Sequence, residues 1–113
     1  MQANLKPEVR QQLIAKLNDK ARQDFANYTL TNGVRSLDGQ SIEVLLKLVK
    51  QFNDFNENND PHGEHDFGSI VFNGTKYFFK IDYYDWKMKG HSQDPVNPFI
   101  TKRVITVMSA SEY

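Results

Sequence analysis

Hydrophobic residues in the first quarter of the chain recur about every four positions, which predicts an amphipathic helix. The stripe consists of Leu5, Val9, Leu13, Leu17, Ala21 and Phe25, with Ile14 beside it. Asn4 is the expected N-cap, and Pro7 fits the first turn because the N–H it lacks has no helical partner there. We expect the stripe to face a core.

A second helix is expected after a short extended stretch. Residues 28–31 favour a strand, Asn32-Gly33 marks a turn, and residues 34–37 either continue as a second strand or lead on. Asp38 or Ser41 is the expected cap of the helix, which ends in the polar run 56–61 at Pro61. Its apolar stripe is formed by Ile42, Leu45, Leu46, Val49 and Phe52, with Phe55 as an extension.

A β-hairpin is the strongest local signal. Two β-prone runs, 67–72 and 75–84, flank Asn73-Gly74, the dipeptide preferred in a type I′ turn because both positions need positive φ. The turn sets the register, so that residue 72 faces 75 and residue 67 faces 80. The alternation predicts a core face of Ile70, Phe72, Tyr77, Phe79, Ile81 and Tyr83. The opposite, mixed face carries Phe67, Ser69, Val71, Lys76, Phe78, Lys80 and Asp82.

The last part of the chain predicts one irregular loop and one more strand. The loop spans 87–101 and contains Gly90, Pro95 and Pro98, whereas residues 103–109 alternate in the manner of a strand. We find no repeat and no linker, so residues 1–113 are expected to form a single domain. The predicted fold is α+β, with two helices of the N-terminal half packed on one face of a small antiparallel sheet that contains the hairpin 67–84 and the C-terminal strand.

Composition narrows the classes of partner. Fourteen basic and fourteen acidic residues give a net charge of zero, so there is no general electrostatic attraction to nucleic acid, and a nucleic-acid partner is not expected. Residues 54–66 hold five carboxylates and no Lys or Arg, and this acidic patch would repel phosphate unless a cation intervened.

The absence of cysteine and of long apolar segments indicates the cellular compartment of the protein. The chain has no cysteine, which excludes disulfides and thiolate metal sites. Residues 1–16 lack the apolar block of a secretory signal, and no apolar run is long enough to cross a bilayer. A cytoplasmic protein without a membrane contact is expected.

The hairpin register has a chemical consequence. It places His65 opposite Asp82, at a cross-strand distance suited to a hydrogen bond. A carboxylate holds an imidazole in one tautomer, as general acid–base catalysis requires, which makes His65 and Asp82 the candidate catalytic pair. The same pair is also explained as a structural clip that closes the open end of the hairpin, and that interpretation is the favoured one.

Neighbouring carboxylates extend the candidate site. The expected binding residues are Glu64, His65, Asp66, Asp82 and Asp85. A divalent metal could be held by His65, Asp66 and Asp82, and no other cofactor is predicted. The common catalytic motifs are absent from the sequence, which has no His-Glu-x-x-His and no glycine-rich phosphate loop. Asp66 with Asp85-Trp86-Lys87 matches an Asp…Asp-x-Lys nuclease pattern only in spacing, since the second element runs past the predicted strand end.

Several segments resemble a family of small bacterial proteins known only as a domain of unknown function. They are Asn-Asp-Pro-His-Gly-Glu-His-Asp-Phe-Gly (59–68), Lys-Ile-Asp-Tyr-Tyr-Asp (80–85), Ser-Gln-Asp-Pro (92–95) and the ending from 101 to 113, with Leu17-Asn18-Asp19 and residues 30–34. The resemblance implies a protein encoded on bacterial chromosomes, plasmids and other mobile elements. It implies no particular activity. Where that family has an aromatic after the proline, this chain has His62, which argues against His62 as a required ligand.

Two functional hypotheses follow. The first is a non-enzymatic module that binds a protein partner through the acidic and aromatic hairpin surface, in the setting of an accessory or anti-defence protein of mobile elements. The second is a metal-dependent or acid–base hydrolase, similar to a nuclease, centred on His65 and Asp82. The lack of a recognisable catalytic set favours the first. The oligomeric state is left open.

Overall fold

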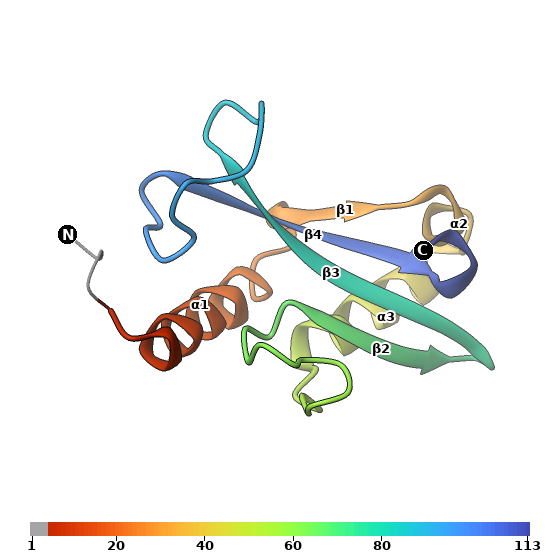
Figure 1. Ribbon diagram of the computed structural model, residues 1–113. Coiled ribbons are helices and arrows are strands. Elements are labelled where there is room, and N and C mark those ends of the chain that lie inside the picture. Colours follow the sequence, from red (N-terminus) through yellow and green to blue (C-terminus); the bar gives the residue numbers. More distant parts are fainter. Residues whose placement is uncertain (1–4) are drawn as a thin grey trace.

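The computed structural model describes residues 5–113, in which the helices α1, α2 and α3 come before the strands β2, β3 and β4 (Figure 1). In order, the elements are α1 (Pro7–Ala21), η1 (Phe25–Asn27), β1 (Tyr28–Leu30), α2 (Asn32–Arg35), α3 (Gly39–Gln51), β2 (Phe67–Phe72), β3 (Thr75–Asp85), β4 (Thr101–Ser109) and η2 (Ala110–Glu112). Asn4, the expected N-cap of the first helix, lies outside the described residues, and Pro7 occupies the first turn as expected.

The strands form one mixed sheet in the order β1-β4-β3-β2. β3 runs antiparallel to both β2 and β4, but β1 runs parallel to β4, with Tyr28 beside Ile105 and Leu30 beside Val107. The α+β class and the placement of helices in the N-terminal half are confirmed, whereas the expectation of a purely antiparallel sheet is wrong. A three-residue strand carries no pattern that specifies the direction of its neighbour, so this pairing was not readable from the sequence.

The hairpin has the predicted register. Phe72 pairs with Thr75 and Phe67 with Lys80, around a turn in which Asn73 and Gly74 have φ of 50° and 78°. The predicted core face is buried or half-buried along its length. The Asn-Gly turn therefore sets the position of every side chain on β2 and β3.

The first helix is shorter than predicted and its buried face is different. α1 ends at Ala21, and Phe25 is 41% exposed in η1 rather than on the helix stripe. Asp24 has an extended backbone and accepts a hydrogen bond from the N–H of Ala26, which starts a new turn. The residues that α1 buries are Ile14, Ala15 and Asn18, followed by Arg22 just past its end.

The second helix begins as predicted but is shorter than predicted. α3 ends at Gln51, because Phe52 has an extended backbone, so Phe52 and Phe55 lie beyond the helix. Asp38 caps α3 by accepting the N–H of Ser41 at 2.8 Å, and Leu45 and Val49 are fully buried. The segment before it is a short helix, α2, so the alternative of a strand at residues 34–37 is wrong. One reason is the carboxylate of Glu112, which accepts the N–H of Gly33 at 2.9 Å and holds this bend against the end of the chain.

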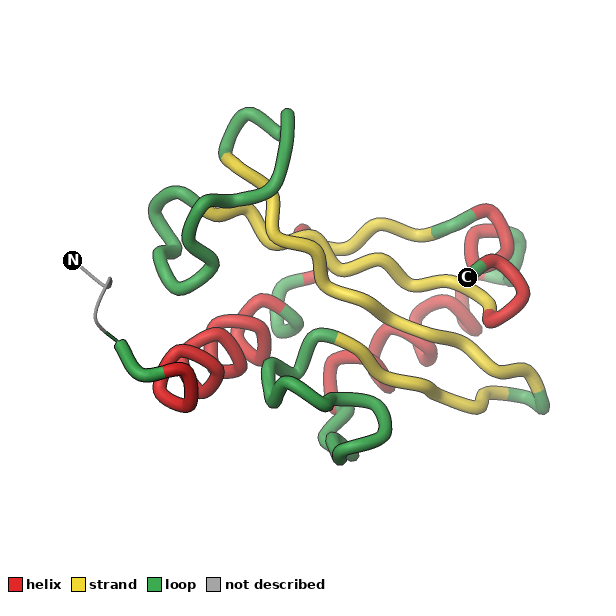
Figure 2. The backbone as a smooth tube through the Cα atoms, in the orientation of Figure 1, coloured by secondary structure: helices red, strands yellow, loops and turns green. Residues whose placement is uncertain are grey.

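The core lies between the helices and one face of the sheet, here called the inner face. Its fully or nearly buried members are Val34, Leu45, Val49, Ile70, Tyr77, Phe79, Ile81, Ile105 and Val107. α1 and α3 lie on the same side of the strands (Figures 1 and 2). On the opposite, outer face of the hairpin, Tyr113 after η2 packs against Phe67 and Phe78. Among the described residues, no helix is both long and apolar enough to cross a membrane.

Candidate functional site

Polar side chains, rather than the leucine stripe, join α1 to the sheet. The amide of Asn18 is fully buried, and its Nδ2 donates to the hydroxyl of Tyr83 at 2.8 Å and to the carbonyl of Glu64 at 2.9 Å. Its Oδ1 accepts from Nε of Arg103 at 2.7 Å. One side chain therefore links α1, β3, β4 and the loop before β2, and all of its polar atoms have partners.

A tyrosine and an arginine continue this network. The hydroxyl of Tyr83 donates to Oε1 of Glu64 at 2.8 Å, and burial raises the pKa of Tyr83. The guanidinium of Arg103 lies 5.1 Å from the centre of the Tyr83 ring, and its Nη2 donates to the carbonyl of Pro95. Burial lowers the pKa of Arg103. We call Asn18, Glu64, Tyr83 and Arg103 the interlayer network.

Arg22 fastens α1 to the end of α3. Its Nη1 donates to the carbonyls of Val49 at 2.8 Å and Phe52 at 2.9 Å, at the point where α3 ends. The carbonyl of Val49 also accepts the N–H of Phe52 at 3.2 Å. Its Nη2 donates to Asp19 at 2.9 Å. The side chain is only 4% exposed, so this buried charge is balanced by carbonyl oxygens and one carboxylate.

His65 is held between two carboxylates at the mouth of the same interface. Its Nδ1 lies 2.9 Å from Oδ1 of Asp19, and its ring stacks on Phe55 with the centroids 4.0 Å apart. Asp60, which is 8% exposed, accepts the backbone N–H groups of Glu64 at 2.9 Å and of His65 at 3.1 Å. The imidazole thus has a carboxylate partner, but the partner comes from α1 and not from the hairpin.

The predicted pairing of His65 with Asp82 is wrong. The β2–β3 ladder ends at Phe67 opposite Lys80, and His65 has φ of 58°, which breaks the alternation of side chains. The imidazole therefore lies on the helix side of the sheet. Asp82, between the inward-facing residues 81 and 83, points to the outer face and pairs with Lys80 at 3.0 Å.

The other candidate residues are not gathered in one place. Asp66 is half-buried, and burial together with the charges of Glu64 and Asp60 raises its pKa. Asp85 accepts the N–H of Lys89 at 3.1 Å and so closes the turn after β3. Glu64, His65 and Asp66 adjoin the interlayer network, while Asp82 and Asp85 lie away from it. Across residues 5–113, no three His, Cys, Asp or Glu side chains are grouped to hold a metal ion.

Most of the residues that build this interface were not predicted from the sequence as site residues. They are Asn18, Asp19, Arg22, Tyr83 and Arg103. Asn18 and Arg22 repeat the four-residue spacing that begins at Ile14, and this spacing is a signal that they share a buried face. The spacing can be recognised as a sign of burial only when it is known that the leucine stripe is not the most buried face of α1.

An aromatic cluster covers part of the outer face. Phe67 and Phe78 have ring centroids 5.1 Å apart, and the ring of Tyr113 lies 5.3 Å from Phe78 and 5.7 Å from Phe67. Val71 on the same face is 67% exposed. The outer face thus presents apolar side chains that nothing in residues 5–113 covers completely.

The edge of the sheet formed by β2 is open. The carbonyl of Asp66 accepts the N–H of Ile81, so even-numbered residues of β2 point their backbone groups toward β3. The backbone groups of Phe67, Ser69 and Val71 therefore point away from the sheet. In the part of the chain that the structure describes, none of the backbone hydrogen bonds outside helices and strands involves these three residues.

The fold and the interlayer network define an α+β protein in which α1 and α3 lie on one side of a four-stranded mixed sheet. The chain belongs to the family described as protein of unknown function DUF3768, whose sequence model matches residues 30–112. The expected membership of a family of unknown function is thereby confirmed. The match begins inside β1, so α1 lies outside it. No curated protein and no solved structure matches the chain.

Proposed function

We propose that this protein is a non-enzymatic protein-binding module that accepts an extended segment of a partner protein along β2. The observation that carries the proposal is the sequence of this edge strand, Phe-Gly-Ser-Ile-Val-Phe, which has no charged residue and no proline. Natural edge strands are normally protected by lysines, prolines or bulges, because unpaired backbone groups attract a further strand. An unprotected edge supports strand addition as the mode of binding.

The side chains beside the edge indicate what the partner presents. On the outer face, Val71 is 67% exposed and Phe67 belongs to the aromatic cluster with Phe78 and Tyr113. A strand added to β2 places alternate side chains beside these residues. The proposed partner segment therefore has β-branched or aromatic residues at every second position, and needs no strong net charge because β2 has none.

The setting of this binding is part of the same proposal. The family resemblance suggests an accessory or anti-defence protein of bacterial mobile elements, acting in the cytoplasm on a host protein. An exposed strand edge suits such a role, because main-chain pairing tolerates variation in the partner's sequence.

The alternative of an acid–base or metal-dependent hydrolase is less well supported. It required His65 and Asp82 to face each other, and these side chains lie on opposite faces of the sheet. The pair that does form, His65 with Asp19, shares its carboxylate with Arg22, and Asp19 is therefore engaged in holding α1. We favour the binding module.

The proposal is tested with peptides selected by the purified protein from a random display library. We expect enriched sequences with apolar residues at alternate positions, whose binding slows hydrogen exchange at the amides of Phe67, Ser69 and Val71. Ser69→Pro removes an N–H that faces outward, a place where an edge strand tolerates proline, and should abolish peptide binding. Ser69→Ala keeps the N–H and should bind as the parent does.

A second variant covers the case in which Ser69→Pro fails to fold. Val71→Asp adds a charge to an exposed position on the edge and should weaken binding without changing the melting temperature by more than a few degrees. Failure to enrich any peptide, or equal binding by the parent and both variants, contradicts strand addition at β2.

A further inference from the structure

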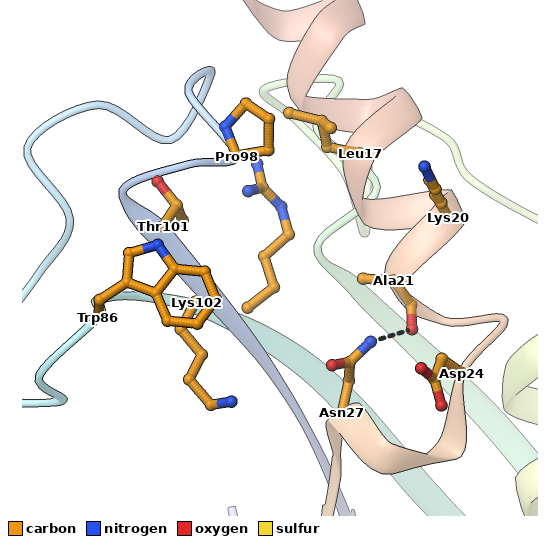
Figure 3. A pocket seen from close by; sticks show the side chains of 10 residues that line it. Leu17, Lys20, Ala21, Asp24, Asn27, Trp86, Pro98, Thr101 and Lys102 are labelled. Atoms are coloured by element: carbon orange, nitrogen blue, oxygen red, sulfur yellow. Dashed lines mark hydrogen bonds between the residues drawn. The ribbon is translucent and has the colours of Figure 1, made fainter.

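A cavity opens where β1 stops covering β4. β1 begins at Tyr28 opposite Ile105, so the first residues of β4 have no strand beside them on this side. The space between them and the end of α1 is a cavity of about 320 Å³. Figure 3 shows its two walls, with Leu17, Lys20 and Ala21 of α1 on one side and the side chains of the β3–β4 region on the other. A cavity of this size lies at the lower end of the range for small-molecule sites.

The charges that line the cavity are mostly positive. Lys20, Lys102 and Arg103 face a single carboxylate, that of Asp24. Asp24 is already the acceptor for the N–H of Ala26. None of the ion pairs formed within residues 5–113 includes Lys20, Lys102 or Arg103. The residues that line the cavity therefore carry an excess of two positive charges, which no ion pair within residues 5–113 offsets.

Arg103 is the strongest element of this excess. The residue is only 8% exposed, and its Nε and Nη2 donate to Asn18 and to the carbonyl of Pro95. Nη1 has no protein acceptor, yet the only sealed side-chain atom without a partner in residues 5–113 is Nε of Arg22. Nη1 of Arg103 is therefore not sealed from solvent, and Arg103 is one of the residues that line the cavity. A desolvated guanidinium without an ion-pair partner is costly, and an anion in the cavity offsets that cost.

A flat aromatic surface stands at the mouth of the cavity. Trp86 is 59% exposed, and Nζ of Lys102 lies 5.9 Å from its ring centre. On the facing wall, Asn27 donates its Nδ2 to the carbonyl of Ala21, as Figure 3 shows, and keeps Oδ1 as a free acceptor. An exposed indole next to a lysine suits a planar ring that stacks while an attached anionic group reaches the cations.

We propose that this cavity binds a small organic anion that carries a planar ring, of the class of nucleoside monophosphates. Lys20, Lys102 and Arg103 bind the phosphate, Trp86 stacks on the base, and Oδ1 of Asn27 accepts from an exocyclic amino group. The site is separate from the β2 edge, so ligand binding here does not depend on the strand-addition proposal.

Trp86 is the single tryptophan of the chain, so fluorescence excited selectively in tryptophan, and not in the five tyrosines, reports on this site. We expect adenosine and guanosine monophosphates to quench it with saturation and to raise the melting temperature. Adenosine without phosphate and inorganic phosphate without a base should each bind at least about tenfold more weakly, because each lacks one of the two contacts. Binding should weaken with added salt.

Matched variants separate the cavity from general charge effects. Lys102→Glu and Lys20→Glu lie on the two walls and should each weaken nucleotide binding about tenfold or more. Lys47→Glu changes the same charge on the exposed face of α3, where Lys47 pairs with Glu43, and should leave binding unchanged. Arg103→Met should also weaken nucleotide binding, and it is used as a test only if its melting curve shows a folded protein.

Four results would overturn the proposal. The first is the absence of a saturable change in both fluorescence and melting temperature with every nucleotide. The second is equal binding by inorganic phosphate, which would remove the ring from the site. The third is binding of single-stranded oligonucleotides much more tightly than any mononucleotide, which would indicate a nucleic-acid surface. The fourth is a loss of affinity in Lys47→Glu that matches the loss in Lys102→Glu.

Discussion

Asn18 and Arg103 are 85 residues apart in the chain, and a hydrogen bond of 2.7 Å joins them across the interface between α1 and the sheet. The bond leaves no polar atom of Asn18 without a partner, since Nδ2 donates to Tyr83 and Glu64. The attachment of α1 therefore depends on one fully buried amide more than on the leucines of the same helix.

Removing that amide should destabilise the protein strongly. Asn18→Ala leaves Nε of Arg103 and the hydroxyl of Tyr83 with fewer partners in a buried place, and we expect a loss of about 2–4 kcal/mol in the free energy of unfolding. Urea denaturation followed by circular dichroism measures it. Lys16→Ala, exposed on the same helix, should change the value by less than about 0.5 kcal/mol. Similar losses for both variants would contradict the role of the interlayer network.

Gly68 should not accept a side chain. A Cβ at this position would lie 2.3 Å from the ring of Phe79 and 2.9 Å from Phe52, and both rings are packed in the core. Gly68→Ala should therefore cost about 1–3 kcal/mol in overpacking. Gly39→Ala is the matched control, because nothing lies within 4 Å of its added Cβ. Differential scanning calorimetry should show a lower melting temperature for Gly68→Ala and no decrease for Gly39→Ala.

Loss of stability at acid pH should arise partly from protonation of Glu112. Hydrogen bonds from Thr31, Ser109 and Gly33 lower its pKa from 4.5 to about 2. A folded pKa below the unfolded one gives stability that is present above about pH 4.5 and is lost as the pH falls toward 2. Melting temperatures measured from pH 7 to pH 2 should show Glu112→Gln less stable than the parent at neutral pH. The two curves should converge at the acid end, and a constant gap would contradict this assignment.

Loss of stability at alkaline pH should arise partly from ionisation of Tyr28. Burial raises its pKa from 10.0 to about 12, and its hydroxyl donates to the carbonyl of Arg22 at 2.9 Å. Because the folded pKa lies above the unfolded one, stability is intact below pH 10 and falls as the pH rises from 10 toward 12. Denaturation at stepped pH should show a shallower decline in Tyr28→Phe. Tyr113→Phe, at a 75% exposed position, should follow the parent.

Local patterns predicted the parts of the fold that are determined by neighbouring residues. The Asn73-Gly74 turn and the alternation around it specified the hairpin register, and Asp38 specified the start of α3. The parallel pairing of β1 with β4 joins residues that are far apart, and no local rule determines it. The end of α1 was also missed, because the cap of η1 by Asp24 competes with helix extension.

The candidate site was predicted only in part, for a related reason. Extending the register beyond Phe67 placed His65 opposite Asp82, which holds only while the backbone stays extended. The positive φ of His65 turned its side chain to the inner face, where Asp19 of α1 is its partner. The signal that fixes this turn is Asp60, which binds two backbone N–H groups, and such a contact is not visible as a spacing of residue types.

The position of β4 has a consequence for how the chain is made. β4 is synthesised after β1, β2 and β3, yet it lies between β3 and β1 and supplies Ile105 and Val107 to the core. Until it emerges, β1 has no neighbour in the sheet and the long β3 has one bare side, so a nascent or truncated chain displays two unsatisfied strands at once. Synthesis of β4 therefore acts as the step that completes the sheet, and chains interrupted before residue 101 should be found with chaperones or proteases.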